Sequence, residues 1–99
     1  MKVMNVPTVM DRVSDGTGTG DVCQVVIYND NHNTAEHVMQ CLMSIFNHSS
    51  GLAKKIMLEA HTKGRAIAQV EDFEKALQHQ VQLQSSGLKA EVESISTGL

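Results

Sequence analysis

The stretch that most constrains the fold is the point near residue 28 where an apolar strand gives way to a helix. The run Val25-Val26-Ile27-Tyr28 is short, apolar and rich in β-branched residues, which predicts a buried strand. Four polar residues follow, and Asn33 and Glu36 are then spaced like a capping box, with Asn33 as the N-cap of a helix. A carboxylate, several amides and the open N–H groups of a helix start are therefore expected within one small volume, which is chemistry suited to recognition.

The rest of the chain predicts a small α/β (α+β) domain with the element order β-α-α-β-α-β. Apolar residues recur at three- and four-residue steps in the helices and alternate with charged residues in the last strand. Ser49 or Ser50 can cap the second helix, Gly64 stands where its left-handed C-cap belongs, and Asp72 can cap the third helix. A sheet of three strands needs helices on one face to close a core. The expected strands are residues 23–28, 65–70 and 88–92, and the expected helices are residues 34–46, 51–62 and 73–85.

Residues 1–21 are expected to form a flexible extension that precedes a folded domain over residues 22–99. Residues 15–21 have the composition of a linker, with glycine at every second position. A Gly-x-Gly-x-Gly sequence that binds a nucleotide follows a strand and opens a helix, whereas here the strand comes afterwards. The pattern therefore does not predict a phosphate-binding loop.

Composition and charge exclude several classes of protein. The net charge of −3 argues against binding to nucleic acid, which needs a basic face. No apolar run approaches the roughly 18 residues of a membrane span, and the start lacks the pattern of a signal peptide. A cytoplasmic protein is expected. There is no Lys or Arg between Val13 and Ala53, which reflects either chance or a local negative potential suited to a cationic ligand.

Two separate blocks of sequence resemble the ClpS family. They are Tyr28-Asn29-Asp30 before a capped helix, and Met57-Leu58-Glu59-Ala60-His61 followed by Gly64-Arg65-Ala66. Members of this family are adaptors that bind N-degrons and hand them to a Clp unfoldase, and the resemblance covers about residues 23–95. It implies an antiparallel three-stranded sheet, a role without catalysis or a cofactor, and a partner in the N-terminal domain of a AAA+ unfoldase of the ClpA or ClpC type.

The resemblance also assigns site residues. Asn29, Asp30 and His61 match the residues that bind the α-amino group, and a free ammonium requires such acceptors because it has three N–H donors. The positions that match the hydrophobic pocket are Asn31, Asn33, Ala35, Val38, Met57 and Ala60. At several of these the chain departs from the family, which commonly has Asp at 31, Thr at 33, Pro at 34, Met at 35 and often Val at 60. The exact preference for the first side chain of a substrate therefore stays open.

Two further positions are expected to contact the unfoldase. Glu74 matches an acidic position of the family, and His79 stands where a basic residue is usual. The histidines show no spacing typical of metal ligands, so no metal site is predicted, and these four are expected to be surface or loop residues: His32, His37, His48 and His79.

Simpler interpretations remain open for each site residue. Residues 29–31 could be a turn whose side chains satisfy the backbone, His61 could interact with a helix dipole, and Met57 could be a core residue. A small Cys/His hydrolase is disfavoured because both Cys23 and Cys41 fall within apolar patterns. The alternative function is a small interaction domain, like the C-terminal domain of the ribosomal stalk protein, which would lack the pocket.

Overall fold

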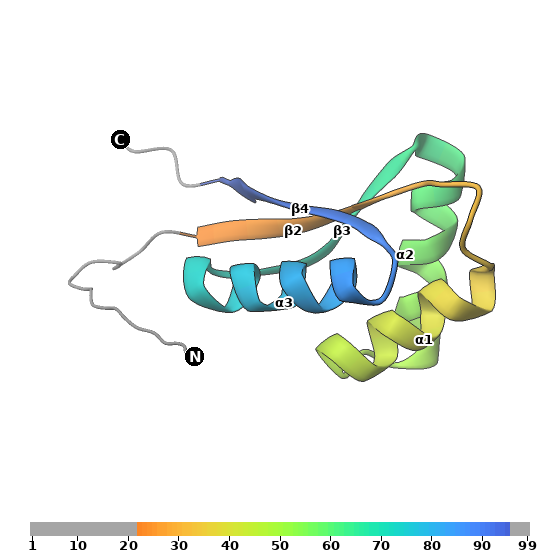
Figure 1. Ribbon diagram of the computed structural model, residues 1–99, viewed down its shortest axis with the longest axis horizontal. Helices are drawn as coiled ribbons and strands as arrows, with labels where there is room; N and C mark the ends of the chain where they lie inside the picture. The colour runs from red at the N-terminus through yellow and green to blue at the C-terminus, as the bar shows by residue number, and fades with distance from the viewer. Residues whose placement is uncertain (1–21, 96–99) are drawn as a thin grey trace.

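The computed structural model describes residues 22–95, which form three strands and three helices in the predicted order (Figure 1). The predicted fold class is confirmed, whereas the expected flexible extension over residues 1–21 lies outside the described residues. The elements are β2 Val22–Tyr28, α1 Ala35–Phe46, α2 Ser50–Lys63, β3 Arg65–Asp72, α3 Phe73–Ser85 and β4 Lys89–Ser94.

The sheet is antiparallel and has β2 at its centre, in the order β3-β2-β4. Ile27 of β2 lies opposite Ala66 of β3 and opposite Ala90 of β4. The pairing of β2 with β3 shifts register between Val25 and Val26, as at a β-bulge. Because strand side chains alternate between two faces, Val25 and Ile27 both point to the helix-covered face.

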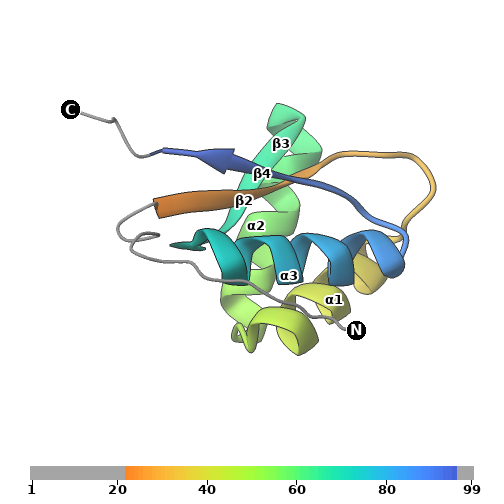
Figure 2. The same ribbon diagram turned by 60° about the vertical axis from the view of Figure 1, so that its left-hand side comes forward.

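The core fills the space between this face and the three helices. Figure 1 shows α1 and α3 on the same side of the sheet, and Figure 2 shows α3 running alongside β2. Leu42 of α1 and Leu83 of α3 are fully buried, and each contributes roughly 1.5–3 kcal/mol by leaving water. Small side chains allow close approach of the elements: Ala53, Ala60, Ala66, Ala68, Ala76 and Ala90.

The helix caps follow the prediction with one correction. Ser49 caps α2, Asp72 caps α3, and Gly64 ends α2 with a φ of 92°. The predicted capping box at the start of α1 is wrong, because Thr34 is the N-cap and its hydroxyl oxygen accepts a hydrogen bond from the backbone N–H of His37. The amide of Asn33 makes other contacts, described below, and the helix consequently begins one residue later.

Two of the histidines expected to be surface or loop residues pack around Phe46. The ring of His48 stacks on Phe46 with centroids 5.2 Å apart, and the ring of His79 lies at 4.6 Å from Phe46. Nδ1 of His79 is 2.5 Å from a carboxylate oxygen of Glu71, whose side chain is only 9% exposed. His48 lies in the loop between α1 and α2, as expected, although its ring is partly buried and Nε2 lies 2.8 Å from the carbonyl oxygen of Ala68. The expectation is wrong for His79, which lies within α3, is partly buried and contacts Glu71.

Within residues 22–95, no helix is long and apolar enough to cross a membrane.

Candidate functional site

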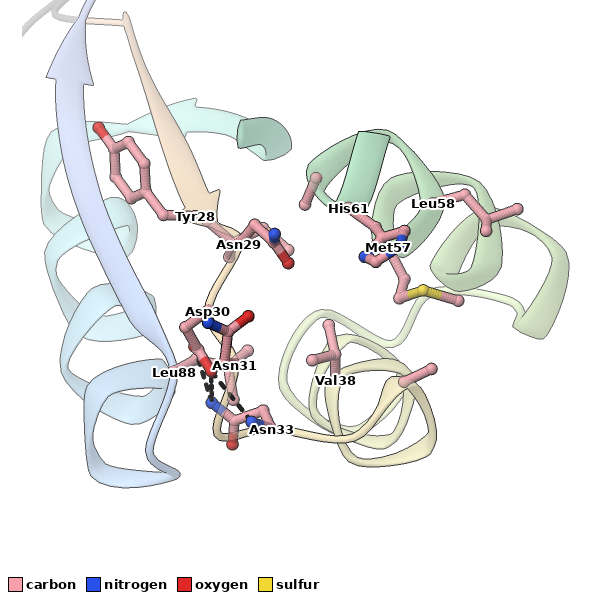
Figure 3. A pocket seen from close by; sticks show the side chains of 13 residues that line it. Tyr28, Asn29, Asp30, Asn31, Asn33, Val38, Met57, Leu58, His61 and Leu88 are labelled. Carbon is pink, nitrogen blue, oxygen red and sulfur yellow. Dashed lines mark hydrogen bonds between the residues drawn. The ribbon is translucent and has the colours of Figure 1, made fainter. Parts of the chain in front are cut away.

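A pocket of about 340 Å³ opens where the end of β2 faces α1 and α2 (Figure 3). All nine residues assigned to amine binding or to the hydrophobic pocket line it, although they come from two separate stretches of the chain, 29–38 and 57–61. The sequence analysis assigned no site role to the remaining lining residues, which are Ile27, Tyr28, Leu58 and Leu88.

The loop after β2 is organised by the carboxylate of Asp30. Its Oδ1 accepts hydrogen bonds from the backbone N–H groups of His32 (2.8 Å) and Asn33 (3.0 Å). The side-chain amide of Asn33 donates to both carboxylate oxygens, at 3.0 and 2.9 Å. The backbone N–H of Asn29 donates to the carbonyl of Gly64, which ties the start of the loop to the end of α2. Hydrogen bonds thus fix the loop at its start, through Asn29, and at its end, through Asn33.

This hydrogen bonding shifts the acidity of Asp30. Partial burial acts to raise the pKa of its carboxyl group, but the bonds from the Asn33 side chain and from the His32 and Asn33 backbone outweigh it. The net result is a pKa below the ordinary value of an aspartate. Asp30 is therefore a carboxylate at neutral pH, and its Oδ2 keeps lone pairs available for a further donor.

The opposite wall consists of residues from α1 and α2. Met57 and His61 are one helical turn apart on α2, so they lie on the same face of that helix. Figure 3 shows Val38 of α1 and Met57 of α2 across the opening from the loop, and the ring of His61 on the side of the opening that faces Asn29. Neutral imidazole and amide oxygen atoms accept hydrogen bonds, so this rim offers acceptors on both sides.

The base of the pocket is apolar. Ile27 is 2% exposed, Ala60 is 5% exposed and Leu88 is 6% exposed. Leu88 comes from the turn between α3 and β4, and Figure 3 shows it on the loop side, beside Asp30 and Asn33. A pocket with buried apolar atoms below and polar acceptors at its rim can hold a ligand that has an apolar group next to a donor group.

The charge of the lining is negative. Asp30 is the only acidic residue that lines the pocket, and no Lys or Arg lines it within the described part of the chain. A cationic ligand would therefore meet an unopposed carboxylate near the rim.

The two residues expected to contact the unfoldase lie elsewhere. Glu74 is exposed in the first turn of α3, just after the N-cap Asp72. His79 is 20% exposed in its side chain and is engaged by Glu71, so it offers less surface than a solvent-exposed basic residue would. Neither residue lines the pocket.

The chain matches one protein-family model. Residues 19–91 match the family described as "ATP-dependent Clp protease adaptor protein ClpS".

Curated proteins of the same description are similar in sequence. The ClpS adapter protein of Syntrophus aciditrophicus is 36% identical over 53 residues, which is 54% of this chain and 50% of that protein. That of Lawsonia intracellularis is 45% identical over 47 residues, covering 48% and 43%, respectively. That of Desulforapulum autotrophicum is 34% identical over 68 residues, or 65% of each. The matched part of this chain thus spans about half to two thirds of the length of these relatives.

A solved structure shares the fold. The structure of Agrobacterium tumefaciens ClpS2 bound to L-phenylalaninamide superposes with a TM-score of 0.66. The match covers 75% of this chain and 96% of that one, at 22% sequence identity.

Proposed function

Because this chain belongs to the ClpS family of Clp protease adaptors, we propose that it binds protein substrates by a free N-terminal residue with a bulky hydrophobic side chain and delivers them to a Clp unfoldase. The family is one of adaptors rather than enzymes, so the pocket needs only to bind and release. The substrates in question are N-degrons that begin with Leu or an aromatic residue.

One observation carries the proposal, namely the pairing of acceptors at the rim with apolar atoms at the base of a single pocket. Asn29 and His61 would accept hydrogen bonds from the α-ammonium group, and Asp30 would add its negative charge. The first side chain of the substrate would then enter between Val38 and Met57. The lining of the pocket supports both roles.

The expected affinity follows from these contacts. Charge-assisted hydrogen bonds to the ammonium are worth roughly 1.5–3 kcal/mol each. Burial of a Leu or Phe side chain adds roughly 1.5–3 kcal/mol. After the cost of association, a dissociation constant near the micromolar range is expected.

Delivery requires a second surface. We place the contact with the N-terminal domain of a cytoplasmic ClpA- or ClpC-type unfoldase at the start of α3, where Glu74 is exposed. His79 would contribute less directly than a free basic residue because Glu71 holds its ring. Residues 1–21 are proposed to engage the unfoldase during handover.

A panel of peptides that differ only in the first residue tests the binding step. Titration should give micromolar dissociation constants for first residues Leu and Phe, and much weaker binding for Lys and Gly. Val38→Lys places a charge in the pocket wall and should abolish the preference, whereas Met43→Lys, on an exposed position of the same helix, should not. Equal binding of all first residues by the wild-type protein would overturn the proposal.

A further inference from the structure

The turn that connects α3 to β4 is held by two side chains, one from the loop before α1 and one from the first turns of α1. The amide of Asn33 donates to the carbonyl of Gly87 at 3.0 Å, across 54 residues of sequence. Nε2 of His37 lies 2.8 Å from the carbonyl oxygen of Ser86, across 49 residues. A carbonyl can only accept, so Nε2 of His37 carries the hydrogen and donates it.

These two carbonyls belong to the segment that carries Leu88. Gly87 has a φ of 94°, and its N–H donates to the carbonyl of Gln84, while the N–H of Leu88 donates to the carbonyl of Leu83. The N–H groups of the turn are thus satisfied by α3, whereas its Ser86 and Gly87 carbonyls are satisfied by His37 of α1 and by Asn33 of the loop before α1, respectively. Without these two donors, the turn would be fixed to α3 alone.

Leu88 belongs to the apolar base of the pocket and lies on the loop side, across from Val38 and Met57 (Figure 3). It is 6% exposed and lines the pocket, whereas His37 is exposed and does not line it. The ring of His37 is therefore connected to the pocket through the turn that carries Leu88. Asn29 and His61, in contrast, lie at the rim of the pocket.

We propose that His37 is a positioning residue. Together with Asn33 it fixes the 86–88 turn to segment 33–37, and it thereby sets how closely Leu88 approaches the first side chain of a bound peptide. The inference rests on the proposed function, because it concerns the specificity of the same pocket. The side-chain amide of Asn33 also donates to the carboxylate of Asp30, so substitution of Asn33 would disturb both the loop after β2 and the 86–88 turn. The ring of His37 contacts the carbonyl of Ser86 and, at 3.6 Å, Sγ of Cys41. His37 is therefore the better residue to test.

The test compares His37→Ala with His37→Gln, whose amide keeps a donor, and with Gln40→Ala on an exposed position of the same helix. Each variant is titrated with two peptides that differ only in a first residue of Leu or Ala. His37→Ala should weaken binding of the Leu peptide about fivefold, the ratio typical of one lost hydrogen bond. Binding of the Ala peptide should change less than about twofold, since the amine contacts are unchanged. His37→Gln should recover most of the preference for Leu, and Gln40→Ala should retain all of it.

A second readout needs no peptide. The methyl resonances of Leu88 should shift in His37→Ala and return toward wild type in His37→Gln. The proposed role of His37 is overturned if the Leu88 resonances do not shift in His37→Ala. It is also overturned if they shift while the ratio of the Leu-peptide affinity to the Ala-peptide affinity stays constant. If the wild-type protein binds neither peptide, the proposed function fails, and the Leu88 resonances still decide whether His37 positions the turn.

Discussion

Asn33 is the residue that joins the separate parts of the site. One hydrogen of its amide is shared between the two oxygens of Asp30, and the other reaches the carbonyl of Gly87. Through this side chain the loop after β2 and the turn before β4 are fixed to each other. The Asp30 carboxylate is what makes the arrangement favourable, because hydrogen bonds to a charged acceptor are stronger than bonds between neutral groups.

Acid should loosen this loop by protonating Asp30. The pKa of Asp30 is lowered on folding, so its carboxylate stabilises the native state at neutral pH, and this contribution is lost as the pH falls through the lowered pKa. Wild-type protein should therefore lose more thermal stability than Asp30→Asn between neutral pH and a pH below the ordinary aspartate value of about 3.9. Melting temperatures measured across that range check this, and parallel curves for the two proteins would contradict it.

The choice of first side chain should depend on Ala35. This residue lines the pocket in the first turn of α1, and a longer side chain there would narrow the mouth. We expect the wild-type protein to accept the β-branched residues Ile and Val in addition to Leu. Ala35→Met should reduce binding of Ile and Val peptides relative to Leu, because branching at Cβ adds bulk near the rim. The measurement is a titration series on both proteins, and an unchanged ranking would show that Ala35 does not gate the pocket.

At the scale of elements, side chains of α3 cover the outer edge of β4. The side-chain oxygen of Gln80 accepts from the backbone N–H of Val92 at 2.8 Å, and the amide of Gln84 donates to the carbonyl of Ala90 at 2.9 Å. Open backbone groups on an edge strand invite pairing with another chain. Two glutamines one helical turn apart thus satisfy two backbone groups on the outer edge of β4 and fix this strand to α3.

Gln80→Ala should lower the free energy of unfolding by about 1–2 kcal/mol, because the partly buried N–H of Val92 loses its acceptor. Gln78→Ala is the matched control, since Gln78 is exposed on the same helix, and it should change the stability by less than about 0.5 kcal/mol. Urea denaturation of the two variants gives both values. Equal stabilities would show that the glutamine contact contributes nothing.

The helices and strands could be predicted because the residues that mark them interact with residues close by in the sequence. Ser49, Gly64 and Asp72 mark helix ends through contacts within four residues, and the structure has all three in those roles. The choice between Asn33 and Thr34 as N-cap could not be predicted, since the Asn33 side chain is engaged both by Asp30 nearby and by Gly87, 54 residues away.

The pocket shows the same division between local and distant signals. Val38, Met57 and His61 lie on helices whose periodicity is visible in the sequence, and their assignment came from the resemblance to ClpS. Leu88 was missed because nothing in the sequence around it indicates that it meets the loop after β2. The pair of His79 with Glu71 likewise depends on how α3 crosses the sheet, which no spacing in the sequence reveals.

At the scale of the whole molecule, the pocket and the start of α3, which is the proposed contact with the unfoldase, are separate surfaces. Glu74 is exposed and does not line the pocket. The two binding activities should therefore be separable by mutation.

Glu74→Lys should reduce binding to the N-terminal domain of a ClpA- or ClpC-type unfoldase at least fivefold, because it reverses a charge on the proposed contact surface, and charges that come to face one another with like sign are unfavourable. Peptide affinity should stay within about twofold of wild type, since the change is remote from the pocket. Titrations with the isolated unfoldase domain and with a Leu peptide check both statements. Parallel loss of both affinities would argue against two independent surfaces.

The central claim is that the pocket recognises a free α-amino group together with the side chain beside it. The most direct measurement compares a peptide that begins with Leu to the same peptide acetylated at its N-terminus. Acetylation removes the charge and most of the donors, so binding should weaken at least about a hundredfold, equivalent to roughly 2.7 kcal/mol or two charge-assisted hydrogen bonds at the low end. Equal affinity for the two peptides would contradict the account.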